Sequence, residues 1–192
     1  MIDAGATMSE RTVVSEAWGS HGVMNEGDRV LMNELGPRIC ILGPSNAGKS
    51  TLAHTIACAN DLTCVHLDQL RHVPGTPWTL RDDEAFQALH DAAIAEDRWV
   101  MEGNYSRLLP QRLARATGLI VLDVSTGTSL LRYVRRCLDG GPRIGGIGAT
   151  RDPIRWAMLM HIIGPTRAGR RRYAEVFAQS ALPKRYISGS RP

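Results

Sequence analysis

The sequence predicts an α/β protein built on a doubly wound parallel sheet, and three observations support this prediction. Short apolar runs that end in polar residues alternate with segments of helical spacing between residues 38 and 188. The runs are apolar throughout, as are strands buried on both faces of a parallel sheet. One run leads through a glycine-containing loop directly into a helix. Strands that alternate with helices in this way pack around one core.

Length and composition set the class of protein. A chain of 192 residues with 43% hydrophobic content fits one globular domain with an extension. The four cysteines show no C-x-x-C pairing, so we interpret them as small buried residues in a reducing compartment. The longest apolar run, residues 156–163, is too short to cross a bilayer, and no secretory signal is visible. We therefore expect a cytoplasmic protein without a membrane partner.

Residues 1–37 differ from the rest of the chain. They carry a net charge of −4. Because the whole chain has a net charge of +4, residues 38–192 carry a net charge of +8. No helical or alternating period is sustained there, and five glycines interrupt the segment. We predict a poorly ordered N-terminal extension at 1–37, of which residues 1–31 are dispensable, and a single folded domain at 38–192. The alternative is an arm that binds a partner.

The first predicted strand, Arg38–Leu42, leads into the segment Gly43–Thr51, which reads GPSNAGKST. This matches the phosphate-binding loop G-x-x-x-x-G-K-[ST] at every fixed position. Its glycines permit the turn that points backbone N–H groups inward, and the following helix adds its positive end. The predicted nucleotide-binding residues are Gly43, Pro44, Ser45, Asn46, Ala47, Gly48, Lys49, Ser50 and Thr51. A chance match is disfavoured because strand, loop and helix follow in the required order, so we predict binding of ATP or GTP with Mg²⁺.

Within this loop, Lys49 supplies a point charge for the outer phosphates and Ser50 a hydroxyl ligand for Mg²⁺. The second predicted strand, residues 62–67, ends at Asp68, at the sheet edge where α/β proteins bind ligands. A loop follows that carries Trp78, either to cover a substrate or simply to pack. The alternative for Asp68 is a helix cap or a surface acid.

Residues 79–82 have the form of a capping box, which predicts a helix that runs to about Glu96. The third strand, residues 99–101, is followed at the same sheet edge by Glu102-Gly103-Asn104-Tyr105. A helix that carries Arg107, Arg112 and Arg115 comes next. The fourth strand, residues 119–123, places apolar residues ahead of Asp123, which resembles the Walker B pattern in outline.

The helix after the fourth strand has two distinct faces. Leu130, Val134 and Leu138 are spaced by four and form the predicted buried stripe. Arg132, Arg135 and Arg136 share another face and lead into a glycine-rich segment at about 139–151. We interpret these arginines as phosphate clamps beside a flap, because guanidinium matches phosphate geometry. The alternative is a solvated face.

The C-terminal third completes the pattern. Asp152-Pro153 predicts the start of a helix that runs to Ile163 and is apolar on nearly all sides, so we expect it to be well buried. A further helix carries Arg170-Arg171-Arg172, and residues 184–188 form the last predicted strand.

Taken in order, these segments resemble the adenylate-kinase-like branch of P-loop proteins, and most nearly the bacterial topology modulation proteins and small P-loop kinases. The resemblance covers roughly residues 38–188, and only the phosphate loop is specific by itself. It depends on these segments: 43–51, His66-Leu67-Asp68, Pro74-Gly75 with Trp78, 98–105, Leu122-Asp123, the helix with Arg132, Arg135 and Arg136, and 184–187.

The resemblance implies a five-stranded sheet of the nucleoside-monophosphate-kinase type, with strand order 2-3-1-4-5 and a flap over the nucleotide. It implies that Asp68 approaches the acceptor as base or orienting group, and that Arg132 with Arg135 or Arg136 acts as the flap arginines. Glu102 stands where such kinases commonly have an aspartate that reaches Mg²⁺ through water. The implied acceptor-binding residues are Asp68, Trp78, Glu102, Gly103, Asn104 and Arg107, the metal residues are Ser50 and Glu102, and the catalytic residues are Lys49, Asp68, Arg132 and Arg136. Two features depart from the family: the flap segment is short and no terminal helix follows the last strand.

The functional prediction is an ATP-dependent phosphotransferase that moves the γ-phosphoryl group to a small acceptor, a nucleotide or a hydroxylated metabolite. A toxin-like kinase that acts on a cell-wall nucleotide precursor is a variant of this hypothesis. The alternative class is a nucleotide-binding regulator of DNA topology with weak or no transferase activity, which the basic body keeps open. No helix-turn-helix or zinc pattern supports nucleic acid as the partner.

Overall fold

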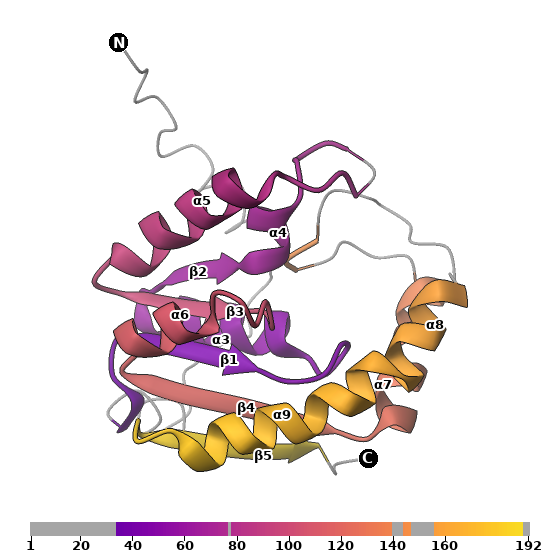
Figure 1. The fold of residues 1–192 in the computed structure, drawn as a ribbon. Helices are drawn as coiled ribbons and strands as arrows, with labels where there is room; N and C mark the ends of the chain where they lie inside the picture. The colour runs from indigo at the N-terminus through magenta and orange to yellow at the C-terminus, as the bar shows by residue number, and fades with distance from the viewer. Residues whose placement is uncertain (1–33, 77, 140–143, 147–155, 190–192) are drawn as a thin grey trace.

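The computed structural model describes residues 34–76, 78–139, 144–146 and 156–189. In these ranges the chain forms a five-stranded, all-parallel sheet with the order β2-β3-β1-β4-β5, flanked by helices on both faces (Figure 1). The predicted fold class and strand order are confirmed. The strands are β1 (Arg38–Leu42), β2 (Thr63–His66), β3 (Trp99–Glu102), β4 (Gly118–Val124) and β5 (Lys184–Gly189).

The helices fall on the two faces as right-handed crossovers require. The chain moves in one direction across the sheet from β1 to β2, and in the opposite direction on every later crossover. Because parallel crossovers are right-handed, the first helix must cover one face and the later ones the other. The helices are α3 (Lys49–Asn60), α4 (Leu67–Arg71), α5 (Asp83–Ala95), α6 (Leu109–Arg115), α7 (Thr126–Asp139), α8 (Trp156–Ile163) and α9 (Pro165–Gln179).

Two apolar clusters show this division. On the α3 face, Ala53, Ile56 and Ala57 pack with alternate residues of β1 and β4, including Ile39 and Ile120. On the opposite face, α5, α6 and α9 pack against the strand residues whose side chains point the other way. These are Cys40 and Leu42 of β1, Met101 of β3, and Leu119 and Val121 of β4. Successive strand side chains point to opposite faces, so the sheet is buried on both sides as the apolar runs predict.

The folded domain begins before the predicted boundary at residue 38. Leu35 is 1% exposed and lies in the α3-side cluster, and Glu34 pairs with Arg185 of β5. A Cβ on Gly118 would lie 2.5 Å from the carbonyl oxygen of Leu35, so this segment is packed tightly against β4. Residues 34–37 therefore belong to the domain, whereas 1–33 of the predicted extension lie outside the described residues.

The burial predicted for α8 is wrong. Ile162 is buried, but Trp156, Met160 and Ile163 are 74%, 48% and 46% exposed. The reason is position: α8 packs mainly on α7 and α9 and not on the sheet. Residues 154 and 155 of the predicted helix lie outside the described residues.

The buried stripe predicted on α7 is also misplaced. Ser129 and Tyr133 are the buried residues of α7, Leu130 and Val134 are partly buried, and Leu138 is 75% exposed, so the most buried face is offset from the predicted stripe. Like α8, α7 lies beyond the end of β4 and has little sheet surface to cover (Figure 1).

Smaller boundaries differ as well. β2 ends at His66, which places Asp68 on the short helix α4 instead of at a strand end. The N-cap of α5 is Asp82, whose carboxylate accepts a hydrogen bond from the Ala85 N–H, so Thr79 is not the cap. Arg107 precedes α6. All four cysteines are free thiols, and Cys58 is exposed, contrary to the prediction.

Two predictions concern segments that are described in part. Of the flap predicted at about 139–151, the described residues are the last residue of α7 and Ile144–Gly146. None of the helices in the described ranges has the length and apolar character needed to span a membrane.

Candidate functional site

The phosphate loop joins β1 to α3 in a conformation that its residue types permit. Gly43 has φ +149°, and a Cβ there would meet the Leu122 carbonyl oxygen at 2.4 Å. Gly48 has φ +95°, and Asn46, a residue type that tolerates the left-handed region, has φ +60°. The invariant glycines of the motif are thus required by backbone geometry at both ends of the loop.

Lys49 and Ser50 occupy the first turn of α3 and point into the loop and toward β3. The Lys49 ammonium donates a hydrogen bond to the Pro44 carbonyl oxygen at 2.9 Å, which keeps it over the loop. The Ser50 hydroxyl donates to Glu102 Oε1, also at 2.9 Å. A cation, a hydroxyl and a carboxylate therefore converge at the positive end of a helix.

Glu102 also pairs with His66, the last residue of β2. His66 Nδ1 lies 2.9 Å from the same Oε1, and its Nε2 lies 3.4 Å from Cys64 Sγ. Burial disfavours the imidazolium, but hydrogen bonds with Cys64 and Glu102 outweigh this and raise the pKa of His66 to about 9. Burial opposes ionisation of Glu102 too, yet His66, Lys49 and Ser50 together lower its pKa. Both directions indicate a buried imidazolium–carboxylate pair next to the phosphate loop.

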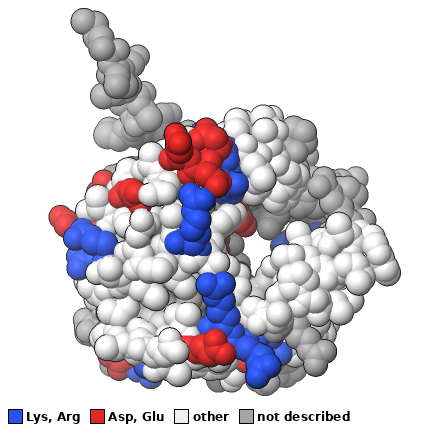
Figure 2. All heavy atoms as spheres, viewed as in Figure 1, with Lys and Arg blue, Asp and Glu red and all other residues white. Residues whose placement is uncertain are grey.

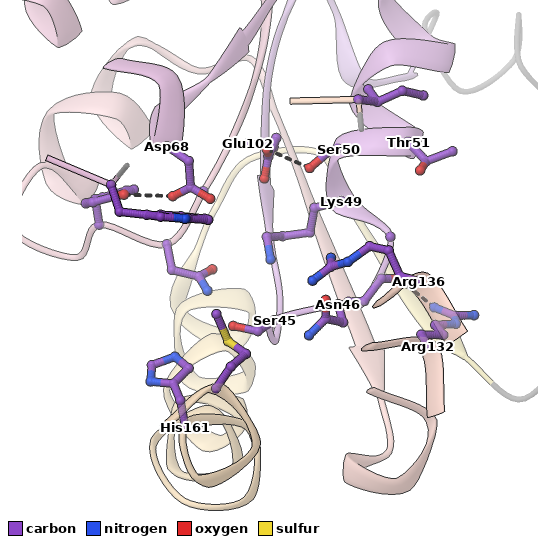
Figure 3. Close-up of a pocket in the computed structure, with 18 residues that line it drawn as sticks. Ser45, Asn46, Lys49, Ser50, Thr51, Asp68, Glu102, Arg132, Arg136 and His161 are labelled. Carbon is purple, nitrogen blue, oxygen red and sulfur yellow. Dashed lines mark hydrogen bonds between the residues drawn. The ribbon is translucent and has the colours of Figure 1, made fainter. Parts of the chain in front are cut away.

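A cavity of about 680 Å³ opens in front of this group. Figure 3 shows Lys49 and Glu102 near its centre, Asp68 on one side and Arg132 and Arg136 on the other. Its walls come from the phosphate loop, α3, α4, the segment after β3, α7 and α8. The lining residues are Ser45–Thr51, Asp68, Trp78, Glu102–Tyr105, Arg132, Arg136, Ile144, Met158 and His161.

Asp68 is held in place by Tyr105. The phenol donates a hydrogen bond of 2.7 Å to Asp68 Oδ1. Burial, the neighbouring Asp68 charge and this bond raise the pKa of Tyr105, so the phenol remains a donor. Trp78 lines the same part of the cavity with φ +66°, and its ring packs edge-on to His72 at 5.3 Å. A fixed carboxylate and an aromatic ring thus form one wall.

The segment after β3 is fixed by Asn104, which the resemblance implied as an acceptor-binding residue, and by Arg112, for which the sequence indicated no role. The Asn104 amide exchanges two hydrogen bonds with the backbone of Gly43, at 2.9 and 3.3 Å. Arg112, fully buried on α6, donates to the carbonyl oxygens of Gly103, Asn104 and Tyr105. These contacts tie the phosphate loop to the wall that carries Tyr105.

Of the three arginines predicted as clamps, Arg132 and Arg136 line the cavity and Arg135 does not. The Arg132 guanidinium donates to the Ala47 carbonyl oxygen at 2.8 Å, which joins α7 to the phosphate loop. Described residues of the predicted flap also reach the site: Ile144 lines the cavity, and Gln69 donates to the Gly146 carbonyl oxygen at 3.3 Å.

Two other predicted residues lie elsewhere. Arg107, an expected acceptor ligand, pairs with Asp83 at 2.8 Å and does not line the cavity. Asp123, in the Walker B-like position, accepts from Arg170 and Tyr186 and also does not line the cavity. Its carboxylate has turned to the α9 face of the sheet, away from α3.

Tyr105 and Arg112 hold parts of the candidate site in place, and the sequence did not predict these contacts. Tyr105 follows Asn104 at a strand end, and this position was its only available signal. Arg112 has none, because an arginine in a helix is ordinarily exposed. Arg71 and Arg107 both pair with Asp83. On the face shown in Figure 2, the described basic side chains stand beside acidic ones and form no continuous basic surface.

Comparisons with known proteins agree with this architecture. No protein-family model matches the sequence, and no curated protein matches it. Among solved structures, a gluconokinase from Sinorhizobium meliloti 1021 matches with a TM-score of 0.50 and 11% identity, over 83% of this chain and 86% of that one. Such a likeness defines the fold: the chain has the P-loop kinase-like fold. The finer resemblance to topology modulation proteins stays a prediction.

Proposed function

We propose that this protein is a phosphotransferase that moves the γ-phosphoryl group of Mg²⁺-bound ATP or GTP to a hydroxyl group of a small acceptor. One observation carries the proposal: a single cavity joins the phosphate loop and its cations to a positioned carboxylate on the opposite wall. Phosphoryl transfer needs positioning and positive charge more than covalent help from the protein, and this cavity offers both.

The donor side would hold the triphosphate. The N–H groups of the loop and the Lys49 ammonium suit the outer phosphates, and Arg132 and Arg136 suit charge on the equatorial oxygens. The Ser50 hydroxyl and the Glu102 carboxylate, 2.9 Å apart, are the hard oxygen ligands that Mg²⁺ prefers, directly or through water. When bound, the metal ion would neutralise charge on the β- and γ-phosphates.

The acceptor side would orient the attacking hydroxyl. Tyr105 donates a hydrogen bond to Asp68 Oδ1, which leaves the second carboxylate oxygen, Oδ2, as the further acceptor atom of this side chain in the cavity. Oδ2 is therefore suited to accept a hydrogen bond from the acceptor hydroxyl and to take its proton as the oxygen attacks.

The test is transfer of ³²P from γ-labelled ATP or GTP to a panel of nucleosides, nucleotides and hydroxylated metabolites. We expect a labelled product with at least one acceptor. The matched variants are Arg136→Ala, which should weaken both triphosphate affinity and turnover, and Arg135→Ala, which should change neither by more than about twofold because it lies outside the cavity. ATP binding without any transfer, together with ATP-dependent DNA binding, would instead support the regulator hypothesis.

A further inference from the structure

Helix α8 contributes the side chains of Met158 and His161 to the lining of the cavity. These two residues are three positions apart, so they lie on the same face of the helix. Because α8 packs mainly on α7 and α9 and not on the sheet, it stands beyond the strand ends, where it closes one side of the cavity (Figure 1). The apolar sequence of α8 predicted a core helix and gave no sign of this placement.

His161 lies on the same side of the cavity as Asp68. Figure 3 shows Lys49 near the centre, with Arg132 and Arg136 on one side of it. Asp68 and His161 are on the other side, which we call the acceptor wall. Asp68 comes from α4 and His161 from α8, so the fold brings together two polar side chains that are far apart in the sequence.

In the proposed reaction, the acceptor has to occupy the space at this wall. Its reacting hydroxyl must stand between Asp68 and the γ-phosphate, which the phosphate loop and Lys49 would hold. In a cavity of about 680 Å³, the rest of a small acceptor then extends along the neighbouring lining, of which the α8 face is a part.

The α8 face offers two kinds of contact to such a molecule. The imidazole N–H of His161 can donate a hydrogen bond to an oxygen of the acceptor. The thioether of Met158, one turn earlier on the same face, gives an adaptable apolar surface beside it. A placed polar group next to an apolar surface is the arrangement that fixes the orientation of a ligand in a pocket.

We propose that His161 binds the acceptor through a hydrogen bond to an oxygen other than the reacting one and so determines which acceptors are used. This inference rests on the proposed function. It narrows the acceptor class to molecules that carry at least two oxygen-containing groups, one that reacts at Asp68 and one that reaches α8.

The experiment measures kcat and KM of the full-length protein separately for the acceptor and for Mg²⁺-ATP. The acceptor probes are adenosine, AMP, ribose, sorbitol and glycerol 3-phosphate. His161→Phe keeps a ring and removes the donor, so we expect the acceptor KM to rise by ~10-fold, the effect of one lost hydrogen bond, while the KM of Mg²⁺-ATP stays within about twofold. His161→Gln keeps an N–H donor and should lose only about threefold.

The matched control is Met160→Ala. Met160 lies on the same helix, is 48% exposed and does not line the cavity, so both KM values should stay within about twofold of the wild type. An acceptor KM for His161→Phe equal to that of Met160→Ala would overturn the proposal and leave the phosphotransferase function standing. A rise in the KM of Mg²⁺-ATP instead would place His161 at the triphosphate and would also overturn it.

Deoxy analogues of the accepted probe identify the oxygen that His161 binds. We expect one analogue to lose ~10-fold in kcat/KM with the wild type and much less with His161→Phe, because that variant no longer makes the hydrogen bond. Equal losses with both proteins for every analogue would contradict the proposal. Transfer to no probe would count against the phosphotransferase function itself, and the assignment of His161 would fall with it.

Discussion

Two acids at the ends of consecutive strands serve different regions of this protein. Glu102 ends β3 and Asp123 lies near the end of β4, each after a run of apolar residues. Glu102 accepts a hydrogen bond from Ser50 on α3, beside the phosphate loop. Asp123 accepts from Arg170 on α9 and from Tyr186 on β5. The same sequence pattern thus yields a site residue on one face of the sheet and a structural ion pair on the other.

The alternation of side chains between the two faces of the sheet explains the difference. Val100 lies in the α3-side cluster, and Glu102, two residues later, faces the same side. Val121 lies in the cluster under α9, and Asp123, two residues later, faces that side. An acid at a strand end therefore reaches the phosphate loop only if its side chain points to the face of the sheet that α3 covers.

The largest expected effect comes from removing the charge of Glu102. Glu102→Gln keeps the size of the side chain but removes its charge, so we expect turnover to fall by ~10²-fold and the apparent Mg²⁺ affinity to weaken. The matched change Asp123→Asn should leave turnover within about twofold because its carboxylate belongs to the α9 face. Steady-state rates as a function of Mg²⁺ concentration measure both. Equal losses in the two variants would contradict the assignment of faces.

Lys49→Ala tests whether the α3 face binds the nucleotide. It removes a cation from the cavity, and we expect Mg²⁺-ATP binding to weaken by ~30-fold or more, since a charge-assisted contact contributes at least ~2 kcal/mol. Titration calorimetry with a non-hydrolysable ATP analogue gives this number. An unchanged affinity, with wild-type circular dichroism as the control for folding, would remove the phosphate-loop assignment.

The His66–Glu102 pair predicts a pH dependence of stability on the α3 face. Hydrogen bonds with Cys64 and Glu102 raise the pKa of His66 to about 9 from its ordinary 6.5, so these contacts stabilise the fold fully below about pH 6.5 and lose this contribution as pH rises through 9. The loss should be on the order of 2 kcal/mol. Urea unfolding at pH 6.5 and at pH 9.5 should show that His66→Gln largely removes this difference. A variant with the wild-type pH dependence would show that other groups cause it.

The smallest expected effect lies on the α9 face. The hydrogen bond from Arg170, burial, and the bond from Tyr186 act on Asp123, and their sum lowers its pKa. The Asp123 side chain is 20% exposed, so solvent weakens the pair and Asp123→Asn should lower the free energy of unfolding by only about 1 kcal/mol. Thermal unfolding measures this. A loss as large as that expected for a buried pair would mean that the α9 face is more tightly packed than its exposure indicates.

Much of the fold could be predicted because the signals are local. Apolar runs located all five strands to within two residues, and the phosphate motif fixed the first crossover. The burial of α7 and α8 could not be predicted, because a pattern shows that a face is apolar but not whether a sheet lies under it. Trp156 and Leu138 are exposed for this reason.

The site divides in the same way. The phosphate-loop residues follow from a motif, and Glu102 and Asp68 from their places after strands. The partners of these acids do not follow from the sequence. His66 and Glu102 are 36 residues apart, Tyr105 and Asp68 are 37 apart, and Arg112 lies 7–9 residues from the carbonyl oxygens that it contacts. Only the fold decides such contacts. The sequence shows which residues of β3 and of β4 share a face of the sheet. It does not show which face α3 covers, because that depends on the strand order.

The most direct test of a transferase with two opposed walls is the Asp68→Asn variant. This change keeps the size of the side chain and removes the charge from the acceptor wall, across the cavity from the phosphate loop (Figure 3). We predict that Mg²⁺-ATP affinity stays within a few fold, while transfer to any accepted substrate falls by ~10²-fold or more, the usual range for an acid–base or orienting group. Wild-type turnover in Asp68→Asn would contradict the account, because the carboxylate would then have no part in positioning or deprotonating the acceptor.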